Sequence, residues 1–313
     1  MSHEDLEYRP DRTPLVRPGE VDLHARDMTA TFSADVTLAQ AQQKLADLGQ
    51  WLPIDGDETW TLGRLIETNS TGPLRLGYGA WRDLLLGCQF QNGRGELITA
   101  GGRTVKNVAG YDLTKFMVGQ RGVFGRLLTV TTRTYLRPTG ALLARFPADA
   151  HQINRLLPTS CRPQWAVLTH QATLCGYLGD ERTIAYYADT LPQHRPLEVL
   201  QQSVDDDIRQ RAELWKAAGA EGSYRASIPP IKVLDFANRA GVTDWAADAA
   251  FGVVVGTTGT ARNKITQAAR EVNGTVLFVE NGKLNVEIDE GIKSLLRRLK
   301  TAFDPEGKLV ELP

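Results

Sequence analysis

The sequence has few of the residues that build metal centres and disulfide frameworks. Its three cysteines, Cys88, Cys161 and Cys175, are far apart, so no paired spacing predicts a disulfide or a zinc site. The five histidines form no ligand pattern such as His-x-x-x-His. We therefore expect no metal centre, and we interpret the cysteines as packing residues.

Long apolar runs are also missing. Runs such as 84–86 and 253–255 are far shorter than the roughly 20 apolar residues that a helix needs to cross a bilayer. The first residues, MSHEDLEYRPDRTP, are polar and lack the apolar segment of a secretory signal. These absences predict a cytoplasmic protein that does not span a membrane.

Neither sign of charge is in excess. The formal net charge is −1, with 23% charged and 42% hydrophobic residues. A nucleic-acid surface is usually strongly basic, and a disordered chain is usually poor in hydrophobic residues. The composition therefore predicts an ordinary globular protein without a nucleic-acid partner, and the chain length favours about two domains.

Hydrophobic periodicity predicts strands and helices in both halves of the chain. A helix is expected to begin at Thr37, which has the capping-box spacing to Gln40, and a break is expected at 138–140. Alternation predicts strands near 28–34, 84–90, 96–100, 128–134, 164–170, 173–178, 183–188, 224–228, 251–255 and 275–279. Apolar faces of helical period predict helices near 205–218, 260–272 and 292–303.

Three glycine-rich segments in the first half stand out. They are TLGRLIETNSTGP (61–73), GGRTVKNVAGYDLTKF (101–116) and GQRGVFG (119–125). Glycine permits positive φ and close approach of main-chain N–H groups to a ligand, so such clusters suit a pyrophosphate. Tight turns in a β-rich domain explain the glycines equally well. The segments contain neither a phosphate loop of the Gly-Lys type nor a Rossmann Gly-x-Gly-x-x-Gly turn, so a dinucleotide here would need another fold.

Longer motifs carry a family resemblance. TLGRLIETNSTGPLRLGYGAWRDLLLG, GGRTVKNVAGYDLTKFMVGQRGVFG and the terminal RLKTAFDPEGKL together resemble the FAD-linked oxidases of the vanillyl-alcohol-oxidase (PCMH) type, most of all the family of FAD-binding E subunits of glycolate oxidase. The likeness is strongest from about 28 to 138. From 141 to 285 only SYRASIPP and the strand near 251–255 are similar.

This resemblance implies an α+β fold. It assigns residues 28–140 to an FAD-binding domain of the PCMH type, 141–290 to an antiparallel-sheet cap or substrate domain, and 291–313 to a C-terminal helix and tail that return to the FAD domain. Residues 1–27 are then an extended N-terminal arm. Family members usually begin with a subdomain that contains an Arg-Gly-Gly-Gly-Thr-type loop, and no such loop precedes Met28, so we expect an FAD domain truncated at its N-terminus.

The resemblance also implies FAD as the cofactor and assigns residues to it. One of these assigned residues, Asp112, fits equally well as the N-cap of the helix expected to start at Leu113. No histidine or cysteine lies in the glycine-rich segments, which favours noncovalent binding. The family pattern places along the pyrophosphate and ribityl chain, or facing the cofactor from neighbouring loops, Leu62, Gly63, Asn69, Ser70, Thr71, Gly72, Gly110, Tyr111, Asp112, Gly119, Gly122, Gly125 and Leu127.

Four positions depart from the family pattern. Arg64 replaces a glycine, and Glu67 replaces a small residue with a carboxylate that would repel a phosphate unless it points away. Arg121 and Arg126 replace an acidic and an aliphatic residue. An arginine beside a pyrophosphate can compensate for lost amide donors through charge-assisted hydrogen bonds, or it can fill an empty site.

Two functions therefore remain open. The first is an FAD-binding subunit of a glycolate oxidase-like oxidoreductase that acts on a small 2-hydroxy acid. The second is a flavin-free structural or assembly subunit of such a complex. Both imply a heteromeric complex with a related FAD-containing catalytic subunit and an iron–sulfur subunit. In either case, any peripheral association with the inner membrane would be made through these partners.

Overall fold

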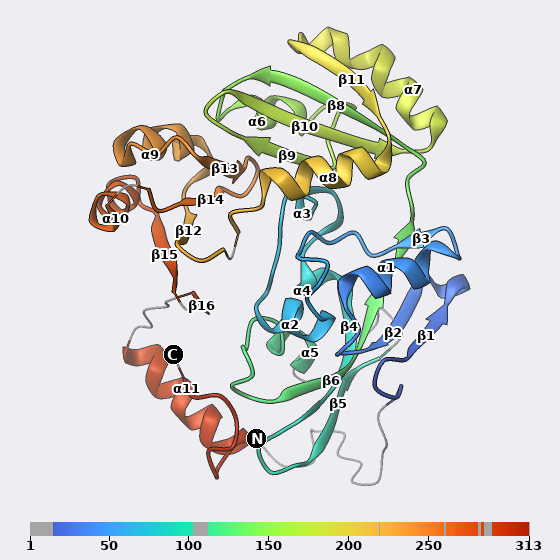
Figure 1. The fold of residues 1–313 in the computed structure, drawn as a ribbon, viewed down its shortest axis with the longest axis vertical. Helices are drawn as coiled ribbons and strands as arrows, with labels where there is room; N and C mark the ends of the chain where they lie inside the picture. The colour runs from blue at the N-terminus through green and yellow to red at the C-terminus, as the bar shows by residue number, and fades with distance from the viewer. Residues whose placement is uncertain are drawn as a thin grey trace. The chain divides into compact units, whose positions relative to one another are not determined.

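The computed structural model of this chain has a mixed α+β fold, which confirms the fold class expected from the sequence (Figure 1). It divides into two compact units. The first unit contains residues 1–71, 79–137 and 287–313, and the second contains 72–78 and 138–286. The residues that the structure describes are 15–102, 112–218, 220–259, 261–280, 283–284 and 290–312.

The first unit is built on a five-stranded antiparallel sheet. In spatial order its strands are β1 (Val21–His24), β2 (Thr29–Ser33), β6 (Arg126–Arg133), β4 (Leu85–Gln91) and β5 (Leu97–Gly101). A 3-10 turn, η2 (Ala25–Asp27), joins β1 to β2. Residues 1–27 were expected to be an extended arm, but β1 pairs with β2 and forms an edge strand of the sheet. A separate short pair joins β3 (Gln50–Trp51) to β7 (Tyr135–Leu136).

Helices cover the apolar face of this sheet. The capping box predicted at Thr37 is confirmed, because Thr37 Oγ1 accepts the amide of Gln40 at 3.2 Å and Gln40 Oε1 accepts the amide of Thr37 at 2.9 Å. The core includes Phe32, Trp81 and Phe90, all fully buried. The helices of this unit are α1 (Leu38–Ala46), α2 (Leu62–Glu67), α4 (Trp81–Leu84), α5 (Leu113–Phe116) and α11 (Glu290–Phe303).

The opposite face of the sheet is polar although it is buried. Thr31 Oγ1 and Thr131 Oγ1 lie 2.9 Å apart across β2 and β6. Gln89 on β4 donates to Thr99 at 3.1 Å, and its Oε1 accepts the amide of Leu15 at 2.7 Å. Hydroxyl and amide side chains that pair with one another can be buried at little cost, so alternation along these strands gives two different buried faces.

The second unit is built on a nine-stranded antiparallel sheet. In spatial order its strands are β11 (Glu198–Gln202), β8 (Gly140–Pro147), β10 (Ala172–Gly179), β9 (Trp165–Leu168), β13 (Trp245–Asp248), β14 (Val253–Thr257), β12 (Ser223–Ser227), β15 (Thr275–Glu280) and β16 (Lys283–Leu284). Its helices are α3 (Arg75–Tyr78), α6 (Gln152–Leu156), α7 (Glu181–Thr190), α8 (Val204–Leu214), α9 (Val233–Ala240) and α10 (Arg262–Glu271), with 3-10 turns η3 (Leu191–His194) and η4 (Pro230–Lys232).

One predicted strand is wrong. Residues 183–188 lie in α7, which packs on β8 and β10 (Figure 1). Asp180 caps this helix, since its Oδ1 accepts the amide of Thr183 at 2.8 Å. The side chains that meet the core, Ile184 and Tyr187, are three residues apart, which is the helical period and not the period of a strand. The short helices α2, α3 and α4 also lie in a stretch where no helix was expected.

No helix in the described ranges is long and apolar enough to cross a membrane.

Candidate cofactor site

The first glycine-rich segment forms α2 and the turn after it. Thr61 caps α2, and its Oγ1 accepts the amide of Arg64 at 3.2 Å. The amides of Leu62 and Gly63 donate to the carbonyls of Val36 and Ala34, both at 2.8 Å. A Cβ atom on Gly63 would lie 2.9 Å from the Ala34 carbonyl oxygen. The glycine is therefore required by close packing, and both amides already have protein acceptors.

The turn after α2 exposes polar side chains. Asn69 has φ +50°, and its amide donates to the carbonyl of Ile66 at 3.0 Å. The amide of Ser70 donates to the carbonyl of Leu65 at 2.8 Å. The side chain of Asn69 is exposed, Ser70 is half-buried, and Thr71 and Gly72 are buried. The donors that this turn offers to a ligand are thus side-chain groups.

The segment 119–125 lies against this turn. The amide of Gly119 donates to the carbonyl of Ile66 at 3.0 Å, and the amide of Arg121 donates to the carbonyl of Glu67 at 2.9 Å. A Cβ atom on Gly119 would lie 3.4 Å from the Cβ of Asn69. Gly119 has φ +85° and is exposed. Two segments that were singled out separately in the sequence therefore meet at Asn69 and Gly119.

The later residues of this segment turn towards the protein. A Cβ atom on Gly122, where φ is +78°, would lie 3.1 Å from the side chain of Val310. A Cβ atom on Gly125 would lie 2.5 Å from the ring of Phe90. Leu127 is 4% exposed and belongs to the core of the first unit. Packing alone accounts for Gly125 and Leu127, so the structure gives them no evident ligand contact.

The third predicted segment is described only in part, because Gly110 and Tyr111 lie outside the described residues. Asp112 is the N-cap of α5, and its Oδ1 accepts the amide of Lys115 at 3.1 Å. Its carboxylate also lies 3.3 Å from the Lys115 ammonium. Of the two interpretations of Asp112, helix capping is the one for which the structure provides contacts.

Glu67 points away from the exposed turn. Its Oε1 accepts the amide of Leu127, at the start of β6, at 3.3 Å. Burial raises the pKa of this carboxyl above its ordinary value, and the Leu127 amide and the Arg126 charge offset only part of that increase. Glu67 thus joins two chain segments and is directed into the protein, so repulsion of a phosphate at Asn69 is not its main effect.

The three unusual arginines differ in their surroundings. The Arg64 guanidinium stacks on Trp60, 3.6 Å from the ring centroid, which is a cation–π contact. Arg126 is exposed at the start of β6. Arg121 is half-buried, and burial lowers the pKa of its guanidinium. Arg64 is therefore occupied by its neighbour, and Arg121 has the most enclosed charge of the three.

These residues fit a diphosphate in part. Five of the amides expected to bind it, those of Leu62, Gly63, Asn69, Ser70 and Gly119, already donate to main-chain carbonyls. Three groups remain for a ligand: the side-chain amide of Asn69, the hydroxyl of Ser70 and the main-chain amide of Gly122. The Gly122 amide has no acceptor among the described residues. A phosphate group would be held here mainly by side-chain donors.

The resemblance assigned the C-terminal helix and tail to the FAD domain, but sequence reasoning missed their contacts with this region. Lys300 on α11 donates to Asp304 Oδ2 at 2.6 Å and to the carbonyl of Val123 at 3.1 Å. Burial opposes ionisation of Asp304, but the Lys300 ammonium and the amides of Leu309 and Lys308 outweigh it and hold the pKa of this carboxyl at about 2. The i,i+4 spacing of Lys300 and Asp304 was visible in the sequence; the contact with Val123 was not.

Aromatic packing fixes the same helix. The Phe303 ring lies 5.7 Å from Phe116, 6.0 Å from Phe124 and 6.3 Å from Phe90, measured between centroids. Aromatic rings at such separations attract each other beyond the area that they bury. The end of α11 is therefore anchored beside the 119–125 segment.

Comparison with known proteins bears on this site. Residues 18–101 match the family described as "FAD binding domain". Glycolate oxidase subunit GlcE of Escherichia coli is 33% identical over 132 residues, which cover 41% of this chain and 37% of that protein. D-lactate dehydrogenase of Archaeoglobus fulgidus is 32% identical over 138 residues, covering 43% and 31%. Glycolate oxidase subunit GlcD of Bacillus subtilis is 27% identical over 161 residues, covering 49% and 34%.

A solved structure extends the likeness to nearly the whole chain. Alkyldihydroxyacetonephosphate synthase is 13% identical, with a TM-score of 0.65, over 94% of this chain and 64% of that one. At this level of identity the likeness shows the fold alone.

Fold and matches together define a protein with an FAD-binding domain of the PCMH type. Residues 18–101 match an FAD-binding domain, and the chain is similar to glycolate oxidase subunits GlcE and GlcD over 41% and 49% of its length. The matched regions span only 31% to 37% of the length of the three relatives named above.

Proposed function

We propose that this chain is the FAD-binding subunit of a glycolate oxidase-like oxidoreductase that acts on a small 2-hydroxy acid. The match of residues 18–101 to an FAD-binding domain supports the cofactor. The observation on which the proposal mainly rests is the meeting of Asn69 and Gly119, because it brings two glycine-rich segments to one exposed edge. FAD, when bound, would accept a hydride from the substrate.

In this proposal the chain binds the cofactor noncovalently. Asn69 and Ser70 donate to the phosphates from one side, and the Gly119–Gly122 turn approaches them from the other. The chain acts with a related FAD-containing catalytic subunit and an iron–sulfur subunit in a cytoplasmic complex. The word "subunit" in the names of both glycolate oxidase relatives supports a complex of several chains.

A second function is favoured by a different observation. The main-chain donors of α2 and its turn are satisfied within the protein, and Arg64 stacks on Trp60, so much of the expected diphosphate site is already occupied by protein contacts. A flavin-free subunit that keeps the fold and docks on a catalytic partner would look like this. Flavin binding therefore separates the two functions.

The experiment is a titration of the purified full chain with FAD, followed by flavin fluorescence, after its visible spectrum has been recorded. Saturable quenching is expected. An absent flavin spectrum together with no saturable quenching would leave only the structural role. Co-purification with an FAD-containing subunit and an iron–sulfur subunit tests the complex.

Variants locate the site. Asn69→Gly keeps the left-handed backbone at φ +50° and removes the side-chain donor. Combined with Ser70→Ala it removes two donors and is expected to weaken FAD binding about a hundredfold or more, because each hydrogen bond to a charged group contributes roughly 1.5 to 3 kcal/mol. Gly72→Arg is expected to abolish binding, and because it places a long side chain at a buried glycine, far-ultraviolet circular dichroism must show an unchanged fold in the same sample. Gly259→Arg controls for the added charge alone, because Gly259 is exposed and a Cβ atom there would have no neighbour within 4 Å. Unchanged affinity in both site variants would show that the loop is not the site.

A further inference from the structure

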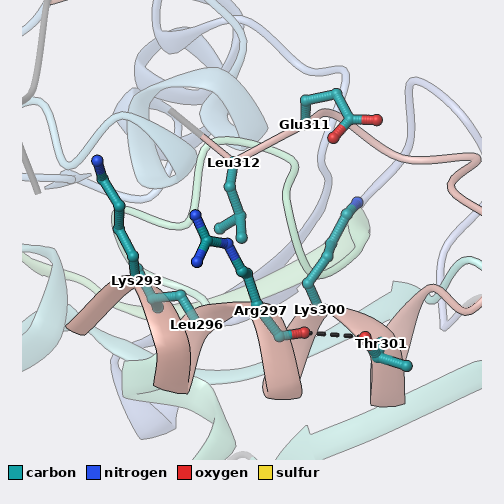
Figure 2. Close-up of a pocket in the computed structure, with 7 residues that line it drawn as sticks. All are labelled: Lys293, Leu296, Arg297, Lys300, Thr301, Glu311 and Leu312. Carbon is teal, nitrogen blue, oxygen red and sulfur yellow. Dashed lines mark hydrogen bonds between the residues drawn. The ribbon is translucent and has the colours of Figure 1, made fainter. Parts of the chain in front are cut away.

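A hollow of about 530 Å³ lies between α11 and the C-terminal tail, residues 304–312, within the first unit. In Figure 2 the side chains of Lys293, Arg297 and Lys300 rise from the same side of α11, towards the tail residues Glu311 and Leu312. Sites for small molecules typically have volumes of roughly 300 to 1,000 Å³. The hollow is lined by Lys293, Leu296, Arg297, Lys300, Thr301, Glu311 and Leu312.

The charge of the lining is positive. Lys293, Arg297 and Lys300 are spaced i, i+4 and i+7, which places them on one face of the helix. Among the described residues, Glu311 is the one carboxylate in the lining. Three cations that converge on one small volume repel one another unless an anion lies between them, so the hollow is suited to a negatively charged group.

The three cations are not equally occupied. Lys300 is committed to the protein through Asp304 and the carbonyls of Val123 and Val310. Lys293 pairs with Glu290 at 2.8 Å, but the Glu290 side chain is 75% exposed, and exposed pairs contribute little. Arg297 forms no ion pair with any acidic side chain in the described part of the chain. Arg297 and Lys293 are therefore the groups that can meet a ligand.

The frame of the hollow is held by the protein itself. Lys300 donates to the carbonyls of Val310 at 2.9 Å and Val123 at 3.1 Å, which fastens the tail to α11 and to the 119–125 segment. The side chain of Val310 also lies against Gly122. A site whose walls are fixed before binding loses less entropy when its ligand arrives.

The remaining lining residues suggest a ligand with an apolar part. Leu296 and Leu312 provide a hydrocarbon wall beside the cations. Thr301 donates its hydroxyl hydrogen to the carbonyl of Arg297 at 3.0 Å, so its oxygen is left as an acceptor. A planar ring joined to an anion would use both kinds of wall, whereas a bare inorganic anion would use only the cations.

We propose that this hollow binds the diphosphate group of a nucleotide, with the Arg297 guanidinium donating to phosphate oxygens and Lys293 adding a second charge. Guanidinium matches the geometry of phosphate in a two-point contact, and an ammonium acts as a point charge. The site goes beyond the proposed flavin role, because ADP carries the same group without a flavin. Where the nucleotide is FAD itself, the inference rests on the proposed function.

The test is calorimetric titration of the full chain with ADP, with adenosine as the phosphate-free probe. Saturable ADP binding is expected, and Arg297→Gln and Lys293→Gln are each expected to weaken it about tenfold or more, the loss of one charge-assisted contact. Arg298→Gln is the matched control, since Arg298 is the adjacent exposed arginine and does not line the hollow. No saturable ADP binding, equally tight adenosine binding, or an equal loss in Arg298→Gln would each overturn the proposal.

Competition identifies the source of the diphosphate. Displacement of bound ADP by FAD, but not by riboflavin, would assign the phosphates of the cofactor to the hollow in place of the turn at Asn69 and Ser70. ADP that stays bound while FAD saturates would assign it to a separate nucleotide. A chain that binds ADP but shows no flavin quenching would keep this site while removing the proposed flavin function, so the two failures are distinguishable.

Discussion

The carboxylate of Glu67 accepts the main-chain amide of Leu127, with Oε1 3.3 Å from the nitrogen, and so joins the end of α2 to the start of β6. Two further bonds follow the same junction, from the amides of Arg121 and Gly119 to the carbonyls of Glu67 and Ile66. The candidate cofactor edge therefore depends on a carboxyl group that is itself half-buried.

Glu67→Gln is expected to stabilise the protein at neutral pH. Glutamine keeps an oxygen that accepts the Leu127 amide and removes a buried charge. Burial raises the pKa of Glu67 above its ordinary value of 4.5, so the folded protein favours the protonated carboxyl. The stability that the protein gains from this protonation is fully present below pH 4.5 and is lost as the pH rises through the pKa of Glu67 in the folded state. The advantage of the variant should thus grow with pH, which thermal melts between pH 4 and 8 would measure.

Glu67→Ala provides the contrast to the glutamine variant. It leaves the Leu127 amide, at a residue that is 4% exposed, without its acceptor, and an unsatisfied buried donor costs about 1 to 3 kcal/mol. Urea unfolding at pH 7 measures this loss. Equal stability of the alanine and glutamine variants would mean that the hydrogen bond does not hold the junction.

Asp304→Asn is expected to loosen the C-terminal tail at neutral pH. The carboxylate of Asp304 accepts the amides of Lys308 and Leu309, each at 2.8 Å, besides the Lys300 ammonium. Its pKa is lowered from 3.8 to about 2, so the stability it contributes is present above the unfolded value and is lost as pH falls from about 4 to about 2. Limited proteolysis of the tail at pH 7 should be several-fold faster in the variant, and the difference in melting temperature should shrink across that acidic window. A tail equally protected in both proteins would contradict this role.

Gly93→Ala is expected to disturb the same anchor from the other side. The amide of Gly93, in the turn between β4 and β5, donates to the carbonyl of Phe303 at 2.9 Å, and a Cβ atom there would overlap the carboxylate of Asp304. Overpacking of this kind costs about 1 to 3 kcal/mol. Gly102→Ala, where an added Cβ would meet nothing within 4 Å, is the control for urea unfolding. If the clash is the cause, the double variant with Asp304→Ala loses less than the sum of the two single changes.

Much of the fold could be predicted from local pattern. The capping box at Thr37 and the hairpin around Asn92-Gly93 follow from short-range hydrogen bonding and turn chemistry. The error at 183–188 has a local cause as well, because the six residues Thr-Ile-Ala-Tyr-Tyr-Ala are too few to separate the helical period from the period of a strand. The helix cap at Asp180 is the signal that favours the helix. Short helices such as α3, of four residues, have too few turns to show a period.

The candidate site was less predictable than the fold. Glycine clusters indicated where chain segments approach something closely, but not what they approach. Gly63 accommodates the Ala34 carbonyl, Gly125 the Phe90 ring and Gly122 the Val310 side chain. These partners lie tens of residues or more away in sequence, so spacing alone could not separate a ligand contact from a packing contact. The direction of Glu67 likewise depends on the position of Leu127, 60 residues later.

The three cysteines are expected to resist thiol reagents in the folded protein. All three are buried, and burial raises the pKa of Cys88 to about 12 and also raises the pKa of Cys161 and Cys175. Because the thiolate is the reactive form, a disulfide reagent at pH 8 should label none of them rapidly before unfolding and all of them afterwards. Fast labelling of one thiol in the native protein would contradict the burial at that residue.

Asp207→Ala is expected to be the most damaging single change in the second unit. Asp207 on α8 has no exposed surface; its Oδ1 accepts the Trp165 indole at 2.8 Å and its Oδ2 accepts Arg211 Nε at 2.9 Å. The alanine variant leaves Arg211, which is 3% exposed, without this carboxylate. Removing one partner of a buried ion pair costs about 3 to 5 kcal/mol of folding stability.

Two further variants separate charge from position in this cluster. Asp207→Asn keeps an acceptor for the indole and is expected to cost less than alanine, while Asp205→Ala, at an exposed position on the same helix turn, should change stability by only about 0.5 kcal/mol.

Gly176→Ala is expected to be nearly as damaging as Asp207→Ala, because Gly176 on β10 faces Trp165 on β9 and an added Cβ would overlap the indole ring. Urea unfolding followed by far-ultraviolet circular dichroism measures all four. If Asp207→Ala and Asp205→Ala lost the same stability, the buried cluster would not be what fastens α8 to the sheet.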